Sequence, residues 1–210
     1  MFASALQELV VGSTIFISVA ILVLAYRLFK KYKKTNGVSF LFWSAGLAIF
    51  AVATLLETLF ALGVYTALLI DIYLFLVVVL VQFLSFGSIE LVKTKRYRDI
   101  YYAFSVIVGA LTLLSICLTN QGYLMQNFVV AGLPNLWVLV TSSIAVFAAS
   151  GVIVVTAAKS YLAKHSWRML SIIAGVIIVA TAGSAYIVQY PWLLYPSEFI
   201  GMVLLWAGFS

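Results

Sequence analysis

The sequence is a succession of long apolar runs separated by short polar segments. Asp, Glu, Lys and Arg are absent from several long stretches, among them residues 9–26, 35–56, 100–158 and 169–197. A helix needs about 20 apolar residues to cross the hydrocarbon core of a bilayer, and the stretch 100–158 is long enough for two crossings and a loop. The pattern therefore predicts seven transmembrane helices, at residues 8–29, 38–62, 68–92, 100–119, 136–158, 169–189 and 192–210.

The seventh predicted helix is interrupted near its start by Pro191 and Pro196. If the helix begins at Pro196, the remaining residues reach only about 21 Å at ~1.5 Å per residue, which is shorter than the bilayer core. It crosses fully only if it begins near Trp192 and accommodates Pro196 as a kink. The alternative is six complete spans followed by a half-helix.

Composition agrees with a membrane protein. Hydrophobic residues make up 65% of the 210 residues and charged residues 9%, whereas soluble domains are about 45–50% apolar and about 25% charged. So few charges could not cover the surface of a soluble fold. We therefore expect an all-α, polytopic membrane helix bundle, forming a single transmembrane domain over residues 1–210 of a multi-pass protein of the cell membrane.

The basic residues predict the orientation of this bundle. All twelve Lys and Arg residues fall in three clusters, within residues 27–34, 93–98 and 159–168. These clusters lie in alternate loops, and basic residues in short loops stay cytoplasmic. The N-terminus is then outside and the C-terminus inside. The clusters also suit anionic lipid headgroups, and their placement argues against a nucleic-acid partner despite the net charge of +6.

Few residues suited to catalysis or metal binding are present. His165 is the single histidine and lies in a cytoplasmic loop, and Cys117 is the single cysteine. A histidine-based haem or metal centre within the membrane is therefore excluded, and we expect no cofactor, no metal and no catalytic residues. An enzyme that works through carboxylates is the least supported interpretation.

Three carboxylates are distinctive because they lack basic neighbours. Glu57, Asp71 and Glu198 are predicted in the outer half of the bilayer, where the chain has no Lys, Arg or His. Ionisable residues inside a membrane are candidate functional sites. Structural interpretations remain open, since Asp71 and Glu198 suit the N-termini of their helices, and Glu57 suits a buried, protonated side chain with a hydrogen-bonded neighbour.

Helical spacing suggests which residues accompany these acids. Thr54 lies on the same helical face as Glu57, among small residues that are typical of helix contacts. Gln82 and Ser85 share a face with Asp71. Together these residues predict a polar cavity open to the outside, in which Glu57 lies near Asp71 and Glu198. Burial and neighbouring like charges disfavour ionisation, so Glu57 is expected to hold a proton until a cation displaces it.

These features predict a function in broad terms. The leading hypothesis is movement of a small cationic solute or a proton through the outward-facing cavity, with Glu57, Asp71 and Glu198 as the candidate site. The alternative is a non-catalytic role as a receptor-like sensor, or as the membrane subunit of a homo-oligomer or a larger complex.

Two further patterns concern helix arrangement. Residues 51–54 resemble residues 178–181, and the same offset aligns Asp71 with Glu198. Spans one to three and five to seven would then be parallel repeats, joined by span four. In addition, Ala145 and Ala149 on span five, and Ser171 and Gly175 on span six, are small residues at a spacing that favours close helix packing. We expect these two faces to meet.

Overall fold

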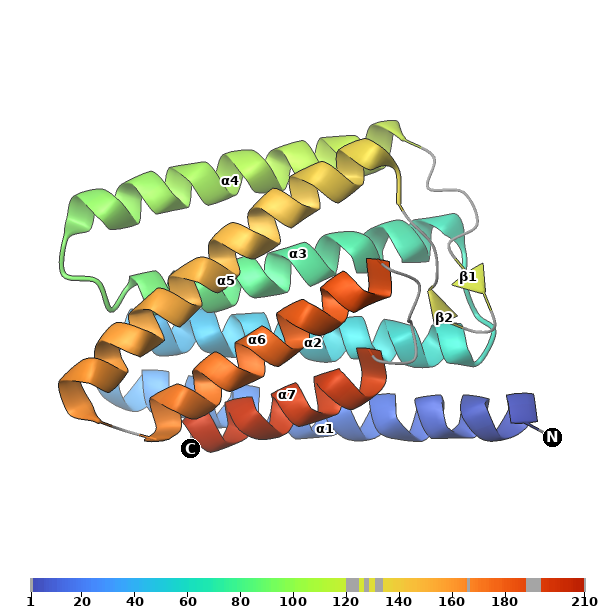
Figure 1. Ribbon diagram of the computed structural model, residues 1–210, viewed down its shortest axis with the longest axis horizontal. Coiled ribbons are helices and arrows are strands. Elements are labelled where there is room, and N and C mark those ends of the chain that lie inside the picture. The colour runs from blue at the N-terminus through green and yellow to red at the C-terminus, as the bar shows by residue number, and fades with distance from the viewer. Residues whose placement is uncertain are drawn as a thin grey trace.

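The computed structural model describes residues 2–119, 125–126, 129–130, 134–165, 167–187 and 194–209. Over these residues it is an all-α bundle, which confirms the predicted fold class (Figure 1). The helices are α1 (Phe2–Thr35), α2 (Val38–Ala61), α3 (Ala67–Ile89), α4 (Lys95–Leu118), α5 (Leu136–Lys164), α6 (Trp167–Ile187) and α7 (Leu194–Phe209). Two short strands, β1 (Met125–Gln126) and β2 (Val129–Val130), pair antiparallel in the connection between α4 and α5.

Five helices, α1 to α5, are long and apolar enough to cross a membrane. The described apolar stretches of α6 and α7 are shorter, at Trp167–Ile178 and Pro196–Phe209. Helix α7 begins at Leu194, so Pro196 lies in its first turn, where a missing backbone N–H removes no helical hydrogen bond. Its 16 residues reach about 24 Å, less than the ~30 Å of a typical hydrocarbon core.

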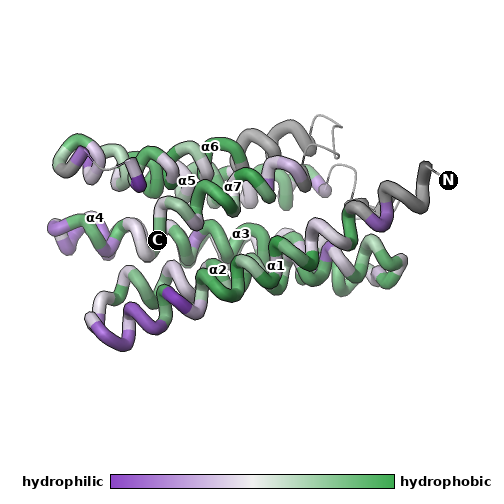
Figure 2. Tube along the Cα trace, turned by 90° about the horizontal axis from the view of Figure 1, so that it is seen from below, coloured by the Kyte–Doolittle hydropathy of each residue, from purple (hydrophilic) through white to green (hydrophobic). Residues whose placement is uncertain are grey.

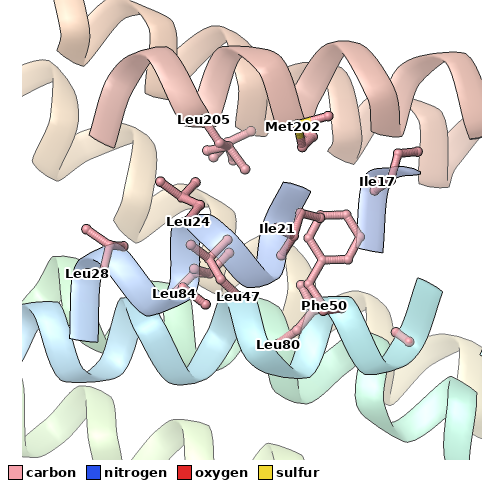
Figure 3. Packing of buried hydrophobic residues seen from close by; sticks show 14 of the residues in the cluster. Ile17, Ile21, Leu24, Leu28, Leu47, Phe50, Leu80, Leu84, Met202 and Leu205 are labelled. Carbon is pink, nitrogen blue, oxygen red and sulfur yellow. The ribbon is translucent and has the colours of Figure 1, made fainter. Parts of the chain in front are cut away.

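Six of the helices form a closed ring. Contacts run in the order α1, α2, α3, α5, α6, α7, and α7 returns to α1. The main hydrophobic cluster draws its buried residues from these six helices, and among the described residues α4 contributes none. Figure 3 shows members of the cluster from α1, α2, α3 and α7. Helix α4 lies outside the ring against α3 and α5, where Val108 packs with Val78 and Ala145. Two parallel three-helix repeats joined by α4 would produce this order, although the duplication itself stays a hypothesis.

Large apolar side chains remain exposed on the outer faces of the helices. They include Phe16, Val106, Ile107 and Phe147, each more than half exposed. In water such surfaces would promote association, whereas in a bilayer they contact lipid. The exposed faces therefore agree with the lengths of α1 to α5, and both indicate a protein embedded in a membrane.

The hydrophilic residues of the helices gather at one end of the bundle, where α1, α4 and α5 reach their basic segments (Figure 2). We call this the basic end. The N-terminus lies at the opposite end, together with the connection between α2 and α3 (Figure 1). Which end faces the cytoplasm stays a prediction from the basic residues.

One expectation about helix packing is wrong in detail. Helices α5 and α6 are in contact, but Ser171 and Gly175 face α7. The Ser171 hydroxyl donates to the Leu204 carbonyl over 2.6 Å, and a Cβ added at Gly175 would lie 3.2 Å from the Gly201 carbonyl oxygen. The spacing of small residues shows which of them share a face, but it does not show which neighbour that face meets.

Candidate functional site

The site is built around Glu57, near the C-terminal end of α2. Its side chain is only 4% exposed, and the Tyr73 hydroxyl of α3 donates a hydrogen bond of 2.6 Å to its Oε1. The connection between α2 and α3 is short, so the two helices run antiparallel as neighbours. Glu57 lies about 6 Å along α2 from this connection and Tyr73 about 9 Å along α3, which places them opposite each other.

The second carboxyl group comes from the other end of the chain. Glu198, in the second turn of α7, is 6% exposed, and its carboxyl group is close enough to that of Glu57 to share a hydrogen bond. It lies on the same stripe of α7 as Met202 and Leu205, which are buried in the main cluster beside α1 (Figure 3). The stripe that packs α7 into the ring therefore also carries Glu198 inward.

Each of these carboxyl groups has a buried oxygen without a partner. Among the described residues, Oε2 of Glu57 and Oε2 of Glu198 accept no hydrogen bond. A buried acceptor left unsatisfied costs about 1–3 kcal/mol, and more when it is charged. An ionised carboxylate can only accept hydrogen bonds, so the two carboxyl groups can form a hydrogen bond with each other only when one of them holds a proton.

No basic side chain of this protein lies near the pair to compensate it. All Lys and Arg residues and His165 belong to the three segments of the basic end. In the described part of the chain, the ion pair recorded is at that end, where Arg98 contacts Glu90 at 2.8 Å. Tyr102 also donates to Glu90, over 2.6 Å. The Lys, Arg and His side chains of the chain therefore supply no positive charge to the Glu57–Glu198 pair.

Hydroxyl groups line the contact of α1 and α2 beside Glu57. The Thr14 and Thr58 hydroxyls lie 2.8 Å apart, and Ser18 donates to the Ala51 carbonyl over 2.8 Å. Thr54, one turn before Thr58, donates to the same carbonyl over 3.0 Å. All four hydroxyl side chains are buried. Farther toward the basic end, the centre of the ring is filled by apolar side chains, including Ile21, Leu24, Leu47 and Leu205 (Figure 3).

Asp71 is placed differently from the other two acids. It is only partly buried, and it precedes Tyr73 by two residues on α3. Positions two apart on an α-helix differ by about 200° in direction, so Asp71 points away when Tyr73 points toward Glu57. The structure thus brings Glu57 and Glu198 together and leaves Asp71 on another face.

The residues expected to line a cavity also separate into two groups. Thr54 lies one turn from Glu57 and belongs to the contact of α1 and α2. Gln82 and Ser85 are buried between α3 and α4, where Gln82 donates to the Ser105 carbonyl over 3.0 Å. The Ser85 and Tyr101 hydroxyls lie 2.6 Å apart. These two residues therefore hold α4 against the ring.

Sequence reasoning missed Tyr73 and Thr14. Tyr73 could have been found, because a short connection between antiparallel helices places residues at similar distances from the turn opposite each other. Thr14 offered no such signal, since α1 and α2 are long and an apolar sequence does not specify the rotation of one against the other. A tyrosine is a suitable partner because its hydroxyl donates to a carboxylate while its ring packs, here against Phe60.

A bundle of apolar helices with exposed apolar faces, in which α1 to α5 are each long enough to cross a bilayer, defines a multi-pass α-helical membrane protein. Within this class, comparisons with models of protein families, with curated proteins and with solved structures find no match for the chain. The Glu57–Glu198 pair is therefore interpreted from its own geometry.

Proposed function

We propose that this protein moves protons or another small cation across the membrane, and that the Glu57–Glu198 pair is the site where the charge binds. The observation that carries the proposal is the burial of two adjacent carboxyl groups, each with an unpartnered oxygen, at the end of the bundle that has no basic side chain. Such a pair attracts positive charge and disfavours anions.

The position of the pair supports this function. Glu57 and Glu198 lie about 6 Å inside the ends of their helices, so the shorter route to them is from the end opposite the basic loops. Beyond the pair, the apolar centre of the ring blocks the way to the basic end. Transport therefore requires a second conformation, in which these apolar contacts open. We propose that the loaded site faces outward first, in the orientation that the basic residues predict.

The test is transport by the purified protein in liposomes. A pH-sensitive dye inside the vesicles would report proton movement driven by a potassium diffusion potential, and then by gradients of Na⁺ or K⁺. We expect the wild type to accelerate proton movement under at least one of these gradients. Glu57→Gln and Glu198→Gln should lower the rate to that of empty vesicles, because each removes a titrating group from the pair.

Asp71→Asn is the matched control, since it removes an acid from the same end of the bundle on another face. It should retain the wild-type rate. Wild-type vesicles as inactive as empty ones under all these gradients, or Glu57→Gln vesicles as active as wild-type ones, would contradict the proposal.

A receptor-like or subunit role is the second candidate, and the apolar packing inside the ring favours it. Ile17, Ile21, Leu24 and Leu28 of α1 are all buried in that cluster, so a continuous polar path would require several helices to move. In this alternative, protonation or cation binding at the pair would change the shape of the bundle without transport. Inactive vesicles, together with a pH-dependent change in the proteolysis of the basic loops that Glu57→Gln abolishes, would support it.

A further inference from the structure

The contacts of the pair distinguish its two carboxyl groups. We infer that the resting site holds one proton, that Glu198 carries it, and that Glu198 donates it as a hydrogen bond to an ionised Glu57. This inference rests on the proposed function only in taking the pair as the binding site. It reverses the expectation from the sequence, which places the proton on Glu57.

Of the two carboxyl groups, Glu57 is the one that accepts a hydrogen bond from a recorded side-chain donor. The Tyr73 hydroxyl donates to its Oε1 over 2.6 Å, a separation within the 2.5–2.7 Å typical of a hydroxyl bonded to a carboxylate. A hydrogen bond donated to the charged form of an acid favours that form. Thr58, the next residue, does not compete for this bond, since its hydroxyl is bonded to Thr14 and to the Thr54 carbonyl.

Among the described residues, no donor comparable to Tyr73 is recorded for Glu198. In the described part of the chain its Oε2 has no hydrogen-bond partner, and the titratable group facing it is Glu57 itself. An ionised Glu198 would place a second negative charge beside the first in a buried site. A protonated Glu198 instead supplies a donor to the neighbouring Glu57 carboxylate, so a single proton provides a hydrogen bond between the two groups.

Other charged groups at this end of the bundle do not alter the assignment. Helix α1 presents hydroxyl groups, with Thr14 and Ser18 buried along its contact with α2. Helix α3 presents Tyr73 and directs Asp71 away, and Glu8 of α1 is exposed. The pair then carries one net negative charge. When the Glu198 proton leaves, the pair gains a second negative charge. A monovalent cation that enters at the same time would return the net charge of the site to minus one.

Infrared spectroscopy of the purified protein tests the position of the proton without a transport assay. The C=O stretch of a protonated carboxyl group is separate from the bands of carboxylates and amides, and it shifts on exchange into D₂O. At neutral pH we expect the wild type to show this acid band. Glu198→Gln should abolish it, because the Gln amide donates the same hydrogen bond to Glu57 but has no acid proton. Glu57→Gln should retain it.

Asp71→Asn and Glu8→Gln are the controls and should keep the band unchanged. Loss of the band in Glu57→Gln with retention in Glu198→Gln would overturn the inference, as would its absence from the wild type or its retention in both variants. If Glu198→Gln does not fold, Tyr73→Phe provides a second test. Removing the donor to Glu57 should shift the acid band from its wild-type position. An unchanged band would contradict the inference. Inactive vesicles from a protein that shows the expected bands would reject the proposed function and leave the inference standing.

Discussion

At the scale of single residues, the candidate site follows from the absence of basic partners. The sequence alone singles out Glu57 and Glu198, because both are acids in apolar helices at the end that lacks Lys and Arg. It also singles out Asp71, for the same reason. The sequence cannot show the direction in which each of these side chains points. Residues two apart on one helix point to nearly opposite sides, and only the packing of α3 determines that Tyr73, and not Asp71, faces Glu57.

Tyr73→Phe tests the role of this hydrogen bond. The substitution keeps the ring and its packing against Phe60 but removes the donor to Glu57. A hydrogen bond between helices in a membrane contributes about 0.6–2 kcal/mol, and we expect a loss of this size, measured as a lower melting temperature in detergent. Tyr65→Phe is the control, because Tyr65 is 47% exposed, and its melting should not change. Equal melting of both variants would show that the Tyr73 hydroxyl does not support the pair.

At the scale of helices, α7 connects the site to the rest of the ring. Its starting position could not be settled from the sequence, because two prolines precede its apolar run. The structure starts it at Leu194, and it packs closely on α6 through glycine. A Cβ at Gly208 would lie 2.3 Å from Ile172 Cγ1 and 3.0 Å from the Arg168 carbonyl oxygen.

Gly208→Ala should therefore destabilise the contact of α6 and α7. Extra atoms in a packed contact cost about 1–3 kcal/mol, which thermal unfolding in detergent would detect as a lower midpoint. Gly151→Ala is the matched control on α5, where a Cβ would meet nothing within 4 Å. It should leave stability unchanged or raise it slightly, since alanine favours helix by about 1 kcal/mol over glycine. A Gly208→Ala protein as stable as the control would contradict the close packing of α7.

At the scale of the whole molecule, the sequence predicts the number and positions of the helices well, and their arrangement poorly. Apolar runs and basic loops define each span, because the bilayer sets the length and the loops carry the charge. The ring order is not predictable in this way. Apolar faces in contact with lipid and with neighbouring helices have similar composition, which is why Gln82 and Ser85 were expected near the acids and are instead buried against α4.

The central claim is that Glu57 and Glu198, from distant parts of the chain, meet inside the bundle, and cross-linking in membranes tests it most directly. Cysteines would replace both residues in a chain with Cys117, which is exposed, changed to serine. A protease site would follow His165, where α5 ends. A short bifunctional thiol reagent should then hold the two fragments together after cleavage.

The same experiment with cysteines at Asp71 and Glu198 is the control, and its fragments should separate because Asp71 faces away. Efficient linkage of the Glu57–Glu198 pair alone is the predicted result. Linkage of the control pair as efficiently, or no linkage of the Glu57–Glu198 pair, would contradict the account.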